Sequence, residues 1–376
     1  MESTKLFTPL KVGNMQLAHR VALPPMTRYR IADGHIPLDI VTEYYAQRAS
    51  VPGTLLITEG TLVSPRGGIY RDVPGLWSRE QVAQWRKVTN AVHAKGSYIY
   101  AQLWAIGRVA DPAATREENG ADAEIMSSSA VGLTPDSVPR EMTEEDIQGF
   151  IEDFATAAKN AVEAGFDGVE IHGANGYLVD QFIQNAVNKR TDRWGGSVEN
   201  RARFPLEIIR AVANTIGAER TAIRYSPWSI FQGMGVDRDD DLVEQFGYLA
   251  QKMAELKLAF VHLVEARIAG NTEVDVEGHR NLDFFLKAYG QAGPVIVAGG
   301  YTGETARHAA DEHYKDYDVL VAIGRSWTAN PDLPFRVKKG ISLRKYEREH
   351  FYTVGNPRGY IDYEFSEEFK SAAVVA

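Results

Sequence analysis

The stretch TEEDIQGFIEDFATAAKNAVEAGFDGVEI, residues 143–171, decides the fold, because it places an amphipathic helix directly before a buried strand. Thr143 is typical of an N-cap and has Asp146 three residues on, while Gly165 is typical of a helix end. The apolar residues between these ends recur with helical spacing and form one stripe. The short run Gly168–Ile171 then has the length and apolar bias of a strand. A helix that leads straight into a buried strand is one unit of a parallel α/β fold.

The same pattern recurs along the chain, where short and continuous apolar runs suit parallel strands that are buried on both faces. We expect eight strands, at Arg20–Leu23, Thr54–Thr58, Ser97–Gln102, Gly168–Ile171, Thr221–Tyr225, Phe260–Leu263, Val295–Ala298 and Val319–Ile323. A further helix is expected after Ser197, ending near Gly217. No Pro/Gly/Ser-rich linker interrupts this order, so residues 1–376 are expected to form one α/β domain, a (β/α)8 or TIM barrel.

Three segments fall outside the repeating units. The stretch LFTPLKVGNMQLAHR, residues 6–20, is typical of a hairpin and would close the floor of the barrel. Two loops are long for plain connections, at residues 105–139 after strand three and 267–280 after strand six. Long ordered loops at the carboxyl ends of barrel strands build or cover a site, whereas their polar, Gly-bearing composition also fits disorder.

Composition limits the classes of function. The net charge of −9 and the isoelectric point near 5.6 argue against nucleic acid and anionic membranes as partners. The chain has no cysteine, which excludes disulfides, thiolate metal sites, iron–sulfur clusters and cysteine nucleophiles. Its start lacks an apolar signal region, and no run of about 18 apolar residues occurs. We therefore expect a cytoplasmic protein with small-molecule partners, as a monomer or homodimer.

In a barrel of this kind, the chemistry is expected at the carboxyl ends of the strands. The residues at those ends are Pro25, Met26, Thr27, Glu59, Gly60, Gln102, Leu103, Trp104, His172, Asn175, Tyr177, Arg224, Glu265, Gly299, Gly300, Gly324 and Arg325. No lysine is among them, which argues against a Schiff-base aldolase. His308 and His313 lie five residues apart in an expected helix and do not share a face, so no metal site is expected.

These strand-end residues suit a large, planar, anionic ligand. The glycines that end strands seven and eight let a backbone approach a phosphate, and Arg325 adds a fork of donors. Gln102 can both donate and accept hydrogen bonds, as an imide-like edge requires, and Thr27 adds a hydroxyl. Arg224 would place a positive charge where a reduced ring system is negative. The set predicts a phosphate-bearing aromatic cofactor.

Several stretches also resemble one known family. They are PPMTRYR (24–30), TEG (58–60), AQLWAIGR (101–108), EIHGANGYLVDQF (170–182), NKRTDRWGGSVENRARFPLEII (188–209), RYSPW (224–228), FVHLVEAR (260–267), AIGRSWTANPDLPFRV (322–337) and GYIDY (359–363). In this order they resemble the old yellow enzyme family, which are FMN-dependent ene-reductases with a (β/α)8 barrel. The patterns HxxNxY and RTDxxGGSxENRxRF are the most specific. The second of these is interpreted as structural, with no catalytic role.

The resemblance implies a set of residues that hold FMN. They are Pro25, Met26, Thr27, Gly60, Gln102, Arg224, Gly299, Gly300, Gly324 and Arg325. Thr27 would lie near the flavin C4 carbonyl, where another branch of the family has cysteine. Many relatives have asparagine at the position of Gly300, so a side-chain contact made there is lost. NADPH or NADH would reduce the flavin by a ping-pong scheme, and no GxGxxG follows a strand to form a Rossmann site.

By the same resemblance, His172 and Asn175 would donate hydrogen bonds to the substrate carbonyl oxygen, and Tyr177 would deliver a proton. Trp104 and Tyr352 would shape the substrate pocket. The chemistry agrees, because hydride attack on an activated C=C builds negative charge on the carbonyl oxygen, which two fixed donors stabilise. A phenol is protonated at pH 7 and can give the proton that the α-carbon needs.

Other interpretations stay open. The stretch QRASVPGTLLITE (47–59) and the HxxNxY region also resemble the ergot-alkaloid branch of the family, whose members reduce or isomerise a conjugated aldehyde of the chanoclavine type. Tyr177 fits a reductase in that branch, and phenylalanine there goes with isomerisation. A general ene-reductase acting on α,β-unsaturated carbonyl compounds is the first hypothesis and the specialised aldehyde reductase the second. A flavin-free barrel lyase or isomerase, or a flavin-binding protein without catalysis, would be alternatives of other classes.

Overall fold

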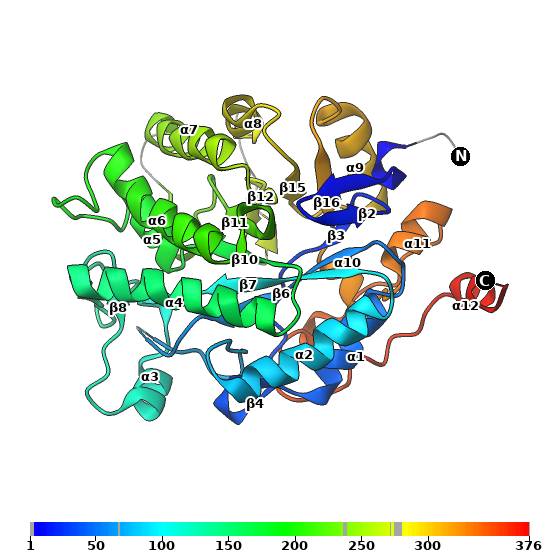
Figure 1. Cartoon of the computed structure of the whole chain (residues 1–376), viewed down its shortest axis with the longest axis horizontal. Coiled ribbons are helices and arrows are strands. Elements are labelled where there is room, and N and C mark those ends of the chain that lie inside the picture. Colours follow the sequence, from blue (N-terminus) through cyan, green and yellow to red (C-terminus); the bar gives the residue numbers. More distant parts are fainter. Residues whose placement is uncertain (1–3, 67, 236–238, 271, 274–279, 376) are drawn as a thin grey trace.

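A closed barrel of parallel strands forms the centre of the molecule (Figure 1). The computed structural model describes residues 4–66, 68–235, 239–270, 272–273 and 280–375. Around the barrel the strands follow the order β3 (Val21–Leu23), β6 (Leu55–Leu62), β7 (Tyr98–Trp104), β10 (Gly168–Gly173), β11 (Thr221–Tyr225), β12 (Phe260–Val264), β15 (Val295–Ala298) and β16 (Val319–Ala322). All eight predicted strands are confirmed, and β16 pairs with β3 to close the barrel.

Burial explains why these runs form strands. Every residue of β10 is buried, although the sequence GVEIHG includes a glutamate and a histidine. Ile171 and the residues that face outward on the other strands pack against the helices. Ala222 and Phe260 belong to a second apolar cluster, which fills the barrel interior. Because each strand is covered on both faces, continuous apolar sequence is stable there.

Helices surround the barrel on its outside (Figure 1). The helices of the described residues are α1 (Asp39–Arg48), α2 (Arg79–His93), α3 (Pro112–Asn119), α4 (Glu144–Glu163), α5 (Leu178–Ile183), α6 (Val198–Ile216), α7 (Asp239–Leu256), α8 (Asp283–Tyr289), α9 (Gly303–His308), α10 (Arg325–Thr328), α11 (Leu333–Lys339) and α12 (Glu367–Val375). The N-cap prediction for α4 is confirmed, since the side chain of Thr143 accepts a hydrogen bond from the backbone N–H of Asp146 and the backbone N–H of Thr143 donates back to the Asp146 carboxylate. Among the described helices, none is long and apolar enough to cross a membrane.

The predicted hairpin is present as β1 (Leu10–Val12) and β2 (Met15–Leu17), which pair antiparallel. The apolar side chains of both strands join the cluster inside the barrel, which includes Leu55 and Phe260 near the amino ends of their strands. The hairpin therefore closes the end of the barrel opposite the expected site.

The two long loops contain short elements where they are described. The loop after β7 includes α3 and the strand β8 (Met126–Ser127), which pairs with β9 (Arg140–Glu141). The loop after β12 contains the paired strands β13 (Ile268–Ala269) and β14 (Thr272–Glu273), and positions 271 and 274–279 of that predicted loop lie outside the described residues. A further pair, β4 (Ile31–Ala32) and β5 (Ile36–Pro37), follows the first barrel strand.

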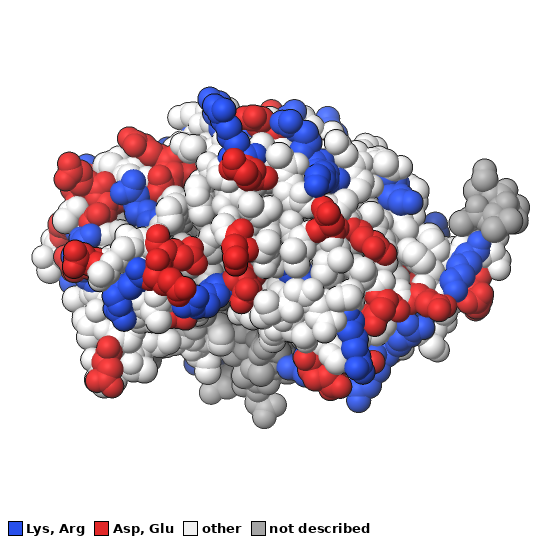
Figure 2. Space-filling model, turned by 90° about the horizontal axis from the view of Figure 1, so that it is seen from below, with Lys and Arg blue, Asp and Glu red and all other residues white. Residues whose placement is uncertain are grey.

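A C-terminal strap, residues 346–363, crosses to the segment that follows β3. Arg28 and Arg30 are buried, and their guanidinium groups donate to backbone carbonyls of the strap. Beyond the strap, α12 lies at the edge of the molecule (Figure 1). The face in Figure 2 carries acidic and basic side chains interspersed with one another.

Candidate active site

One cavity of about 670 Å³ opens where the barrel strands end, within the size range of small-molecule sites. Its wall contains every residue that the sequence predicted to hold FMN, bind the substrate or donate the proton. These residues are Pro25, Met26, Thr27, Gly60, Gln102, Trp104, His172, Asn175, Tyr177, Arg224, Gly299, Gly300, Gly324, Arg325 and Tyr352. The structure thus brings together residues that lie as far as 327 positions apart, from Pro25 to Tyr352.

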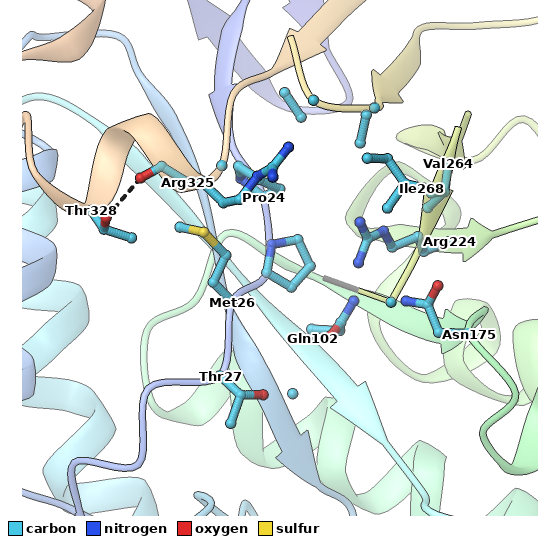
Figure 3. Close-up of a pocket in the computed structure, with 18 of the residues that line it drawn as sticks. Pro24, Met26, Thr27, Gln102, Asn175, Arg224, Val264, Ile268, Arg325 and Thr328 are labelled. Atoms are coloured by element: carbon cyan, nitrogen blue, oxygen red, sulfur yellow. Dashed lines mark hydrogen bonds between the residues drawn. The ribbon is translucent and has the colours of Figure 1, made fainter. Parts of the chain in front are cut away.

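Two arginines and several glycines line the cavity. Arg224 reaches the cavity from β11 and Arg325 from the first position of α10, and Figure 3 shows both guanidinium groups directed into the cavity. A Cβ on Gly324 would lie 3.2 Å from Pro24 Cγ and 3.3 Å from the sulfur of Met26. Gly300 has φ +67, a conformation that favours glycine. The glycines allow close backbone approach and Arg325 beside them supplies a cation, as a phosphate-bearing ligand requires, while Arg224 places a second cation in the wall.

His172 is held as a neutral hydrogen-bond donor. Its Nδ1 accepts a hydrogen bond from the backbone N–H of Ala174 at 3.4 Å, which leaves the ring proton on Nε2. Burial lowers the pKa of His172 well below its usual value, and the charge of Arg224 adds to that shift. At pH 7 the imidazole is therefore uncharged, and Nε2–H is available to an acceptor in the cavity.

Asn175 lies in the turn after β10 with φ +59, a left-handed conformation that asparagine tolerates better than most residues. Its backbone N–H donates to Ser226 Oγ at 2.8 Å. The side-chain oxygen is buried without a hydrogen-bond partner among the described residues. Figure 3 shows the amide nitrogen turned toward the cavity. The next residue, Gly176, donates its N–H to the buried carboxylate of Asp180 at 2.9 Å, which fixes the turn.

Tyr177 is the third residue of the HxxNxY pattern that lines the cavity. Its ring centroid lies 4.9 Å from that of His172 and 4.8 Å from that of Trp104, in edge-to-face arrangements. Burial raises the pKa of the Tyr177 phenol above its usual value of 10, and the neighbouring Tyr70 adds to the shift. The hydroxyl consequently keeps its proton throughout the physiological range and can act as an acid.

A β-bulge positions Gly60 and Trp104. In the pairing of β6 with β7, Ile57 lies opposite Tyr100 but Gly60 lies opposite Gln102, so β6 has one extra residue. The bulge lets β6 continue to Leu62, beyond its predicted end at Thr58, and turns Gly60 toward the cavity. A Cβ on Gly60 would lie 2.8 Å from Trp104 Cε3, so glycine leaves the space that the indole ring fills.

Some strand-end residues do not line the cavity. Glu59 is buried behind the wall, where its carboxylate accepts the backbone N–H of Arg28 at 3.2 Å. Glu265 accepts hydrogen bonds from the hydroxyls of Tyr301 and Tyr314. His308 and His313 are both exposed on the outside of the barrel.

Several wall residues were not predicted from the sequence. The missed residues include Phe231, Ile268, Tyr301, Tyr346 and Phe351. Tyr346 and Phe351 come from the C-terminal strap, for which no strand pattern gave a signal. Glu170 and His262 are polar side chains buried in the barrel beside the cavity, and their interruption of apolar runs was a signal that could have identified them.

The residues present fit FMN. Arg224 Nε and Trp104 Nε1 are buried without a hydrogen-bond partner among the described residues, so donors remain free in the wall. Gln102 contributes an amide, and the glycine border with Arg325 matches a phosphate. The donor set therefore suits a planar anionic cofactor with an imide edge.

Comparisons with known proteins agree with this chemistry. Residues 5–344 match the model of the NADH:flavin oxidoreductase / NADH oxidase family. The chain is 58% identical to the chanoclavine-I aldehyde reductase fgaOx3 of Penicillium roqueforti (strain FM164), over 99% of this chain and 100% of the relative. It is 47% identical, over 100% of both chains, to easA of Epichloe festucae var. lolii, described as a probable inactive reductase. The crystal structure of Old Yellow Enzyme from Pichia sp. AKU4542 superposes with a TM-score of 0.89 at 37% identity, covering 97% of this chain and 94% of that chain.

The cavity, its donors and these matches lead to one assignment, which excludes the flavin-free lyase or isomerase. FMN is the resident cofactor and NAD(P)H is the hydride donor. The chain therefore belongs to the NADH:flavin oxidoreductase / NADH oxidase family, as an FMN-dependent ene-reductase of the old yellow enzyme type.

Proposed function

We propose that the physiological substrate is an α,β-unsaturated aldehyde, and that His172, Asn175 and Tyr177 reduce its C=C bond together with FMN. The observation that carries this proposal is the convergence of two neutral donors and one protonated phenol on one part of the cavity. The 58% identity to a chanoclavine-I aldehyde reductase supports an aldehyde as the substrate class. A general enone or maleimide reductase would use the same three residues.

Each residue has a separate task in this proposal. FMN, when bound, supplies a hydride to the β-carbon. His172 Nε2–H and the Asn175 amide donate to the carbonyl oxygen, where negative charge accumulates, and so stabilise it as an oxyanion hole does. Tyr177 O–H then gives its proton to the α-carbon, and the phenol recovers a proton from solvent. Trp104 and Tyr352 border the substrate and exclude water from it.

The flavin contacts are proposed from the same cavity. Gln102 and Thr27 would contact the imide edge and the C4 carbonyl, Arg224 the pyrimidine end, and Arg325 with the neighbouring glycines the phosphate. The backbone at Pro25 and Met26 would border the ring, and Gly60 would contact it beside Trp104. Support comes from the fact that all these residues line one cavity.

We also infer that residues 1–376 act as one unit, because the N-terminal hairpin and the C-terminal strap both pack on the same barrel. A small-molecule substrate and a monomer or homodimer in the cytoplasm complete the proposal. Sedimentation of the purified protein tests the oligomeric part.

The substrate is tested by the rate at which the reduced enzyme is re-oxidised. Under anaerobic conditions, a chanoclavine-type aldehyde, cyclohexenone and N-methylmaleimide would be mixed separately with the reduced enzyme. We expect the aldehyde to re-oxidise it at least tenfold faster than the other two. Equal rates for all three, or faster re-oxidation by cyclohexenone, would contradict a specialised aldehyde reductase and favour a general one.

A further inference from the structure

Beneath the cavity wall, Glu170 on β10 joins a side chain from the adjacent strand β7 to a side chain from β12, which lies two strands away. Its Oε1 accepts a hydrogen bond from Gln102 Nε2 at 2.8 Å, and its Oε2 accepts one from His262 Nδ1 at 2.8 Å. Glu170 and His262 have no exposed surface, and Gln102 is exposed only where it meets the cavity. The three residues belong to β10, β7 and β12, so the contact spans half of the barrel.

The carboxylate determines which way the Gln102 amide faces. An ionised carboxylate only accepts hydrogen bonds, so the NH₂ group of Gln102 must point toward Glu170. The carbonyl oxygen, Oε1, is then the atom that Gln102 presents to the cavity, and no described residue donates to it. By the same logic His262 carries its proton on Nδ1, and its buried Nε2 has no partner among the described residues.

Glu170 also affects the charge of the site. Burial lowers the pKa of Arg224, and the negative charge of Glu170 opposes that shift. Arg224 pairs in register with His172 on one side and with His262 on the other, so it lies between the catalytic histidine and the Glu170 contact. The carboxylate is therefore a counter-charge for the cation that faces the ligand.

We propose that Glu170 is a positioning residue for the flavin. It holds Gln102 with its carbonyl oxygen toward the cavity, as an acceptor for an imide N–H, and it moderates the positive charge that Arg224 presents to the ring. The proposal rests on the proposed contact of Gln102 with FMN. Glu170 itself touches neither cofactor nor substrate.

Glu170→Gln should reverse the orientation of the Gln102 amide. The new amide must keep an oxygen toward His262 Nδ1–H, so its NH₂ group faces Gln102. Gln102 then turns and presents its own NH₂ group to the cavity, where it opposes the imide N–H. We expect the dissociation constant of FMN to rise about tenfold, as for one lost hydrogen bond. We also expect the flavin reduction potential to become more positive, because a negative charge is removed near Arg224.

A swap of the two side chains provides the matched rescue. In Glu170→Gln with Gln102→Glu, the amide at 170 satisfies both His262 and the carboxylate at 102, which again presents an acceptor to the cavity. FMN affinity should recover, and the potential should return to the wild-type value or below it. The change Asp332→Asn is the control, because Asp332 is equally buried but holds Arg336 and Ser366 outside the cavity.

The experiment measures FMN affinity by fluorescence and the reduction potential by dye equilibration, for all variants and for Gln102→Ala. A Glu170→Gln protein with wild-type affinity and potential would overturn the proposal, as would equal shifts in Asp332→Asn. If Glu170→Gln does not fold, a folded swap with a potential above wild type overturns it, and one at or below wild type supports it. Unchanged FMN affinity in Gln102→Ala would instead show that the assignment of Gln102 is wrong.

Discussion

The imidazole of His172 and the phenol of Tyr177 lie 4.9 Å apart between ring centroids, inclined by 67°. The arrangement places a neutral donor and a proton source beside each other, five residues apart in the chain. A turn with two left-handed residues, Asn175 and Gly176, brings them together. Because His172 donates a hydrogen bond and Tyr177 donates a proton, a change at each residue should affect a different measurement.

Tyr177→Phe should slow only the step that reduces the alkene. Loss of one general acid should lower the rate of re-oxidation by an enal about 10²- to 10⁴-fold, because the α-carbon no longer receives its proton. Reduction of FMN by NADPH should keep its wild-type rate. Stopped-flow absorbance measures both steps, and Tyr70→Phe is the control that removes a nearby phenol outside the cavity wall. Unchanged re-oxidation in Tyr177→Phe would mean that another group donates the proton.

His172→Ala should weaken the binding of phenols, which place a negative oxygen where the substrate carbonyl would lie. We expect the dissociation constant to rise about 10- to 100-fold, because a hydrogen bond to a charged oxygen is lost. The long-wavelength phenol–flavin absorption follows the titration. His308→Ala, at an exposed histidine, should leave it unchanged. A wild-type titration curve for His172→Ala would remove His172 from the proposed oxyanion site.

Gly60→Ala tests the packing of Trp104. The added Cβ would lie 2.8 Å from the indole ring, so the ring must move, and we expect the free energy of unfolding to fall by about 1–3 kcal/mol. Gly247→Ala is the matched control, since nothing lies within 4 Å of its added Cβ in the middle of α7. That change should stabilise the protein by up to about 1 kcal/mol. Chemical denaturation compares the two, and equal effects would show that Gly60 does not reserve space for Trp104.

Arg30→Ala should loosen the C-terminal strap. The guanidinium of Arg30 donates to the backbone carbonyls of His350, Phe351, Asn356 and Arg358. These hydrogen bonds hold the strap in place, and with it the cavity residues Phe351 and Tyr352. We expect trypsin to cleave the variant faster within residues 346–363, and substrate affinity to fall. Arg66→Ala removes a half-exposed arginine that pairs with Asp153, and it should not change the cleavage pattern. Equal cleavage of wild type and Arg30→Ala would show that other contacts hold the strap.

Glu59 should make stability depend on pH. Burial raises its pKa to about 7, from an ordinary value of 4.5. Between these values the folded protein holds a proton that the unfolded chain has released, so the free energy of unfolding should fall as pH rises from about 4.5 to 7, then level off. Glu59→Gln should reduce that fall, by at most about 3 kcal/mol. Denaturation at a series of pH values measures it, and an unaltered slope would contradict the assignment.

The strands and the site could be predicted because the sequence marks them locally. Continuous apolar runs identify strands buried on both faces, and the barrel then brings their ends to one rim, so His172, Gln102 and Arg224 could be placed together before any coordinates. The β-bulge before Gly60 leaves no periodic signal, since it depends on pairing with β7. Phe351 reaches the cavity through Arg28 and Arg30, contacts more than 320 residues apart that no local pattern reveals.

The most direct test of the FMN site and of the proposed C=C reduction is an anaerobic absorbance titration of the purified protein, first with NADPH and then with an α,β-unsaturated aldehyde. We expect flavin bands that bleach with NADPH and return in full when the aldehyde is added, with one aldehyde consumed per flavin. Bands that bleach but do not return would contradict the proposed roles of His172, Asn175 and Tyr177. A protein that cannot be loaded with FMN would contradict the cofactor site itself.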